Sequence, residues 1–103
     1  MILLGELRLA LVRGPSMVPT LRDGDRVLVR LGGGLRPGRV VLVELPGRPL
    51  SVKRLVAVEP GGQIRIEGDN EFGSTDSRTL GPQPAAAVRG VVLARVWPRP
   101  RRL

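Results

Sequence analysis

Short apolar segments rich in β-branched residues recur along the 103-residue chain, with turn residues between them. This pattern predicts β-strands. The segments that show it are rich in Val, Ile and Leu and are separated by Gly, Pro and Asp: residues 25–31, 38–45, 51–59, 63–69 and 88–97. The opening run "MILLGELRLALV" is interrupted by two charged residues, Glu6 and Arg8, and is best interpreted as an additional first strand.

The connections between these strands carry turn residues. "VEPGGQI" predicts a hairpin turn between two strands. Residues 14–24 are expected to form a loop with a helical turn after Pro19, and residues 81–87 a loop with room for one short helical turn. The fold class expected is all-β, with compact curled antiparallel sheets and little helix. The length fits a single domain over residues 1–103.

Composition excludes several kinds of catalytic site. The chain contains neither Cys nor His. Disulfides, thiolate metal sites, His-ligated metals and His-dependent catalytic triads are therefore ruled out. Any general base must be a carboxylate, a lysine amine or a chain terminus. No metal or other cofactor is expected.

The formal net charge of +8 raises the question of an acidic partner. The arginines are spread along the chain, and "RPRR" near its end is the one basic run. A basic nucleic-acid-binding β module stays open as an alternative, but two aromatic residues offer little for base stacking. No apolar segment approaches the ~20 residues that a membrane span needs, and contact of the first dozen residues with a membrane surface is left open.

Lys53 is the single lysine among 17 basic residues. An arginine cannot lose its proton in a protein, whereas a lysine amine can when burial disfavours its charge. Lys53 lies in an apolar segment, "LSVKRLVA", and on a strand it would share a face with Leu55. These features favour a general base, although a lysine that extends its amine to solvent would fit the same segment.

A lysine base needs a nucleophile, and Ser16 is the best candidate. It lies in "RGPSMVPTLRDGD", where Gly14 and Pro15 constrain the backbone before it. Such a turn can present both a hydroxyl and a backbone N–H to a substrate carbonyl. The competing interpretation is a serine that caps a short helical turn.

A third stretch, "EGDNEFGSTDSR" (67–78), concentrates polar groups between apolar strands. Ser74 could orient the lysine amine, and Asp76 could pair with Arg78. A surface loop with a weak ion pair would be equally consistent with these residues. Asp23, Asp25, Asp69 and Asp76 suggest turns more than a metal site, because no further ligands accompany them.

Together, "GPSMVPTLRDGDRVLV", "VKRLVAVEPGG" and "GDNEFGSTDSR" resemble the three sequence boxes of the type I signal peptidase family of Ser/Lys proteases, in the same order. The resemblance implies that Ser16 is the nucleophile and Lys53 the general base. It also implies supporting positions for the following residues: Ser74, which would orient Lys53; Asp76 and Arg78, an ion pair; and Gly68, Asp69 and Asn70, a turn. Pro15 and Met17, which flank Ser16, are expected to contact substrate.

Within that family, the chain resembles the nickel-type superoxide dismutase maturation proteases, through "VRGPSMVPTLRDGD" and the ending V-x-x-R-V-W-P. The implied activity is removal of an N-terminal leader from a precursor, expected to be a nickel superoxide dismutase, which binds as an extended strand. Alternatives are the processing of secreted preproteins and self-cleavage of the repressor type. We expect neither the family's membrane anchor nor its large second β domain in this protein, and Gly14 stands where some relatives have an oxyanion-binding serine. The location expected from these features is cytoplasmic, with peripheral attachment to a membrane left open.

Overall fold

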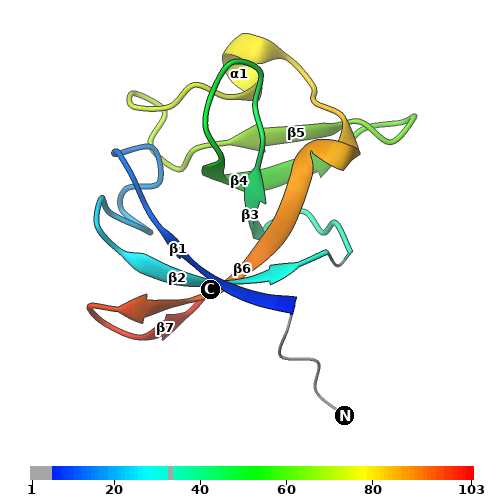
Figure 1. Cartoon of the computed structure of the whole chain (residues 1–103). Helices are drawn as coiled ribbons and strands as arrows, with labels where there is room; N and C mark the ends of the chain where they lie inside the picture. The colour runs from blue at the N-terminus through cyan, green and yellow to red at the C-terminus, as the bar shows by residue number, and fades with distance from the viewer. Residues whose placement is uncertain (1–5, 33) are drawn as a thin grey trace.

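The computed structural model describes residues 6–32 and 34–103, and in this part of the chain the sheet dominates (Figure 1). Seven strands form one antiparallel sheet in the order β1-β2-β6-β3-β4-β5, with β7 paired to β6. The strands are β1 (Leu7–Leu11), β2 (Arg26–Leu31), β3 (Val40–Val43), β4 (Ser51–Val58), β5 (Ile64–Glu67), β6 (Val88–Trp97) and β7 (Arg101–Arg102). The all-β fold class predicted from the sequence is confirmed.

Helical structure is limited to α1 (Ser77–Leu80) and a 3₁₀ turn, η2 (Ala85–Ala87). The sequence pattern anticipated a short turn within residues 81–87 but not α1, which follows directly from the N-cap residue Asp76. In the loop after β1, the backbone N–H of Leu21 donates to the carbonyl of Met17 at 2.9 Å and closes a turn, but residues 14–24 contain no helix, so the helical turn expected there is absent. The predicted β4–β5 hairpin is present, closed by Glu59 and Gln63.

The long strand β6 bends the sheet (Figure 1). It pairs with β2 along most of its length and with β3 at its beginning. The β2–β6 and β3–β6 pairings both contain register shifts, and such bulges increase local twist and bend a strand. The β1–β2 pair and the β3–β4–β5 strands therefore curl around two apolar clusters.

Adjacent residues of β3 reach the two clusters from opposite faces of the strand. Val40 packs in the first cluster and Val41 in the second, as the period-two geometry of a strand requires. The first cluster contains Val12, Met17, Leu21, Val27, Val29, Val40 and Val92. The second contains Val41, Val43, Leu45, Leu55, Ile64 and Ile66. The candidate catalytic residues lie beside these clusters, on β4 and on the loops that follow β1 and β5.

Candidate active site

Lys53 lies in the middle of β4, with its side chain on the buried face of the strand. Its neighbour on that face is Leu55, which is fully buried. Its cross-strand partner is Val41 of β3, which is 1% exposed. Lys53 itself is 5% exposed. Burial lowers the pKa of the Lys53 amine, Asp76 opposes this by raising it, and Arg48 and Arg78 lower it further. The net effect is a lowered pKa, which increases the fraction of neutral amine at a given pH.

Among the described residues, Ser74 is the one hydrogen-bond partner of the Lys53 amine. Nζ donates to Ser74 Oγ at 2.9 Å, and Ser74 Oγ donates to Asp76 Oδ2 at 2.5 Å. A hydroxyl has a single proton to donate, and here Asp76 accepts it. Ser74 must therefore accept from Lys53, so the hydroxyl holds one N–H of the amine and leaves the rest of the nitrogen free to face the cavity.

Asp76 is the fixed end of this chain of hydrogen bonds. It is 1% exposed and accepts from the backbone N–H groups of Gly68 (2.7 Å) and Arg78 (3.0 Å), as well as from Ser74. The Arg78 guanidinium also forms an ion pair with the Asp76 carboxylate, at 2.8 Å. Burial alone would raise the pKa of Asp76, but these hydrogen bonds lower it well below its ordinary range. Asp76 is therefore an ionised acceptor at neutral pH.

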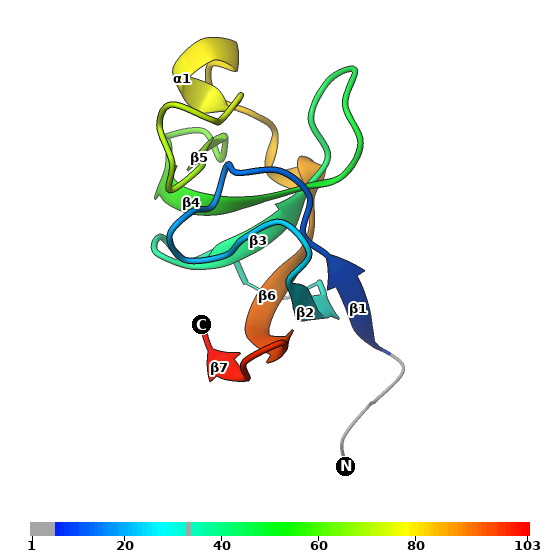
Figure 2. The ribbon, with the colours of Figure 1, turned by 90° about the vertical axis from the view of Figure 1, so that its left-hand side faces the viewer.

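Ser16 lies on the loop between β1 and β2, which runs beside the segment that follows β5 (Figure 2). The backbone N–H of Asn70 donates to the carbonyl of Ser16 at 2.9 Å, and Asn70 Nδ2 donates to the carbonyl of Pro15 at 3.1 Å. Gly68 allows this close approach. A Cβ at Gly68 would lie 2.5 Å from the Ser16 carbonyl oxygen and would also clash with the side chain of Ser74.

Asp69 joins all three sequence boxes, through two residues to which the sequence interpretation gave no role. Arg54 donates to both carboxylate oxygens of Asp69, at 3.0 and 2.6 Å, and Thr20 Oγ1 donates to Oδ2 at 2.5 Å. Burial raises the pKa of Asp69, but Arg54 and Thr20 lower it more. Arg54 adjoins Lys53 in sequence, so this contact ties the lysine strand to the serine loop. The sequence signal was the basic pair "KR", whose second member points to the opposite face of β4.

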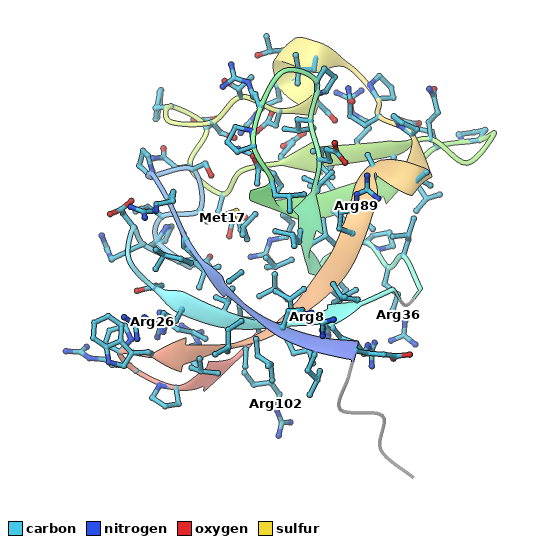
Figure 3. The ribbon with its side chains drawn as sticks, in the orientation of Figure 1. Arg8, Met17, Arg26, Arg36, Arg89 and Arg102 are labelled. Atoms are coloured by element: carbon cyan, nitrogen blue, oxygen red, sulfur yellow. The ribbon has the colours of Figure 1, made fainter. Side chains whose placement is uncertain are left out.

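A cavity of about 990 Å³ connects the candidate nucleophile and base. Ser16 and Lys53 both line it, together with the edge strand β1 and residues 48–52. Pro15 also lines the cavity. Met17 is placed differently: it is 1% exposed and packs in the first core cluster (Figure 3), so its side chain supports the serine loop from within.

The loop that holds Ser16 offers a backbone donor for an oxyanion. The N–H of Gly14 donates to Asp23 Oδ1 at 2.7 Å and is therefore occupied. Among the residues that the structure describes, none accepts a hydrogen bond from the N–H of Ser16. Gly14 has a φ of +79°, a backbone conformation that L side chains rarely adopt. This conformation explains why glycine occupies the position two residues before Ser16.

Asp23 and Asp25, for which the sequence favours a turn over a metal site, accept hydrogen bonds from neighbouring backbone groups. Asp23 accepts from Gly14, and Asp25 accepts from the N–H of Arg22 at 2.9 Å. Asp25 also lies 3.7 Å from the Arg95 guanidinium. Within residues 6–32 and 34–103, no group of three or more His, Cys, Asp or Glu side chains is placed to hold a metal ion. These aspartates stabilise the turn that closes the serine loop.

Comparison with known proteins identifies the family of this site. Residues 4–93 match the family described as Peptidase S24-like, and the chain belongs to this family. It is 36% identical to the mitochondrial ATP-independent inner membrane protease subunit 1a of Arabidopsis thaliana, over 84% of this chain and 68% of that protein. It is 34% identical to the mitochondrial inner membrane protease subunit 1 of Homo sapiens, over 82% and 66%. Signal peptidase IB of Staphylococcus aureus is 39% identical over 59% of this chain and 34% of that protein. The chain spans about two thirds of the length of the mitochondrial relatives.

The relatives confirm the resemblance to signal peptidases, and they contradict the expected cytoplasmic location. Those with a location in their names are proteases of the mitochondrial inner membrane. The expectation rested on the absence of a long apolar segment, which bears on membrane spanning and leaves the compartment undetermined. In the described part of the chain, no helix has the length and apolarity needed to cross a bilayer.

Proposed function

We propose that this protein is a serine endopeptidase with a Ser16–Lys53 dyad that removes an N-terminal leader from a precursor polypeptide. The observation that carries the proposal is the relay from Lys53 through Ser74 to Asp76, with Lys53 and Ser16 lining one cavity. A buried amine held by a hydroxyl, with a lowered pKa, is the arrangement that a lysine base requires. The family membership and the protease relatives support the same reaction.

The reaction follows from these positions. The neutral amine of Lys53 takes the Ser16 hydroxyl proton as Oγ attacks the scissile carbonyl. The developing oxyanion accepts a hydrogen bond from the backbone N–H of Ser16. Protonated Lys53 then gives its proton to the leaving amine, which departs as the new N-terminus. Water, deprotonated by Lys53, attacks the acyl-enzyme ester and releases the second product, and the Ser16 hydroxyl is restored.

The substrate proposed is an extended segment that adds to the exposed edge of β1. β1 pairs only with β2 in the described sheet, so its other edge can pair with a peptide along the cavity. The location proposed is at a membrane, because the relatives include inner membrane proteases. The finer hypothesis is a nickel superoxide dismutase precursor, which rests on the resemblance of the serine box and of the chain's ending. Nucleic acid has no role in this proposal.

The decisive experiment is incubation of candidate precursors with the wild-type protein and with Ser16→Ala. A nickel superoxide dismutase precursor and a secreted preprotein serve as the two substrates. Cleavage at one defined bond by the wild type, and none by Ser16→Ala, is the expected result. Cleavage of the secreted preprotein alone would reject the nickel superoxide dismutase hypothesis and keep the peptidase. Self-cleavage of the protein alone would favour the repressor-type alternative.

A further inference from the structure

The charged residues around the cavity are mostly basic. Besides Lys53, its lining includes four arginines and one glutamate: Arg8, Arg13, Arg48, Arg89 and Glu44. The remaining lining is largely apolar, contributed mainly by β1, β2, β3 and β4. A peptide that enters this cavity therefore meets apolar walls and a positive rim.

The single carboxylate of the lining is already neutralised. Glu44 forms an ion pair with Arg89, which lies near the start of β6 (Figure 3). Arg13 and Arg48 are exposed, and within residues 6–32 and 34–103 no carboxylate forms an ion pair with either. The rim thus retains positive charge that a partner can satisfy.

These two arginines line the same cavity as Ser16 and Lys53. Arg13 lies three residues before Ser16, on the segment that leads from β1 into the serine loop. Arg48 lies on the loop between β3 and β4, which projects on the same side of the sheet as β1 (Figure 2). Arg48 is also close enough to Lys53 for its charge to lower the pKa of the amine. A substrate segment at the scissile bond would therefore share the cavity with two guanidinium groups.

We infer that Arg13 and Arg48 select substrates that carry an acidic residue within a few positions of the cleaved bond. This inference rests on the proposed function and names its substrate class. A carboxylate accepts two parallel hydrogen bonds from a guanidinium, which adds geometry to charge attraction. A basic residue at the same place would be repelled by both arginines, so the pair both favours acidic segments and rejects basic ones.

The test starts with a degenerate library of synthetic peptides long enough to extend through the cavity. Wild-type enzyme digests the library, and sequencing of the products identifies the cleaved bonds. The best-cleaved members are then made as pairs that differ only by Asp or Asn near the bond. The measured quantity is the ratio of kcat/KM between the two members of a pair. This ratio cancels any effect that Arg48 has on the basicity of Lys53.

The wild type is expected to favour the Asp peptide by about 5- to 10-fold at low salt, with the preference falling as ionic strength rises. Arg13→Gln/Arg48→Gln is expected to bring the ratio close to one. Arg48→Lys, in an otherwise wild-type chain, keeps the charge and should retain part of the preference. Arg101→Gln removes the same charge from β7, outside the cavity, and should leave the ratio unchanged.

A ratio near one in the wild type, or one that the double substitution does not alter, would overturn the inference. If the wild type cleaves no peptide or precursor, the proposed function fails by itself. In that case, the inference about Arg13 and Arg48 is tested by peptide binding to Ser16→Ala, measured by fluorescence anisotropy. The Asp peptide should bind more tightly than the Asn peptide. If Arg13→Gln/Arg48→Gln loses affinity for phosphatidylglycerol vesicles but keeps the wild-type kcat/KM ratio between the Asp and Asn peptides, the two arginines bind a lipid surface and the inference is wrong.

Discussion

Lys53 donates a hydrogen bond to Ser74, and the direction of that bond is set by Asp76, which accepts the only proton that Ser74 can donate. This relationship orients a buried amine without pairing it directly with a carboxylate. A direct ion pair would hold Lys53 in its charged form. The intervening hydroxyl allows Asp76 to fix the position of the amine while burial lowers its pKa.

Replacing Lys53 with Met should abolish cleavage and stabilise the protein. Loss of a general base costs roughly 10²–10⁴ in rate. Removal of a buried amine should raise the free energy of unfolding at neutral pH, because folding no longer opposes its protonation. Urea denaturation measures the stability change. Lys53→Arg keeps a positive charge but cannot act as a base, and normal turnover in that variant would refute the mechanism.

The rate of cleavage should rise with pH through the pKa of Lys53, since the neutral amine is the active form. That pKa is lowered from 10.5, so the rise should be centred below that value. Asp76 raises the pKa of Lys53, so Asp76→Asn should move the rise to lower pH while reducing kcat. The pH dependence of the single-turnover rate constant checks both shifts. A rise centred at 10.5 or above would contradict the proposed role of Lys53.

Asp76 should also contribute to stability in a pH-dependent way. Its pKa is lowered from 3.8, so its contribution is present above about pH 4 and is lost as pH falls towards the folded-state pKa. Asp76→Asn should therefore lower stability at pH 7, by about 2–3 kcal/mol, and flatten the loss of stability below pH 4. Thermal unfolding from pH 2 to 7 measures this. Glu71→Gln, an exposed carboxylate nearby, serves as the matched control and should change little.

Gly68→Ala should impair both folding and catalysis. The added methyl group would lie 2.5 Å from the Ser16 carbonyl oxygen and 2.7 Å from Ser74 Cβ, so one of the two loops must move. The free energy of unfolding is expected to fall by about 1–3 kcal/mol, as for other overpacked positions. Gly34→Ala is the control, because a Cβ there meets nothing within 4 Å and its φ is not positive. Equal effects of the two substitutions would show that the close approach at Gly68 is unimportant.

Thr20→Val should weaken the tie between the serine loop and the lysine strand. The substitution keeps the side-chain shape but removes the hydrogen bond to Asp69 Oδ2. A cost of about 1–2 kcal/mol in stability is expected, with a fall in kcat, because Asp69 links Thr20 to Arg54 beside Lys53. Thr79→Val, at an exposed position of α1, is the matched control. An unchanged kcat in Thr20→Val would show that this tie does not position Ser16.

Most of the strands could be predicted from the sequence, and the elements that it missed are short. β7 contains two arginines and pairs with the end of β6, so it has no alternation of its own to detect. α1 contains four residues and depends on the Asp76 cap, a signal that also fits a turn. Strand limits also differ: residues 38–45 were expected to form a strand, but β3 covers Val40–Val43, since Gly38 takes a φ of +95°.

The sequence by itself determined the strand-rich fold and the chemistry available to the site. Apolar segments rich in β-branched residues, bounded by turn residues, identify the strands, and the lack of His and Cys leaves a lysine amine as a candidate base. Only the tertiary structure decided which of these groups meet. Ser74 reaches Lys53 across 21 positions, Arg54 meets Asp69 rather than solvent, and Met17 is buried rather than exposed to a substrate. The physical reason is that periodicity is local, whereas these contacts depend on strand register and on the bulges that curl the sheet.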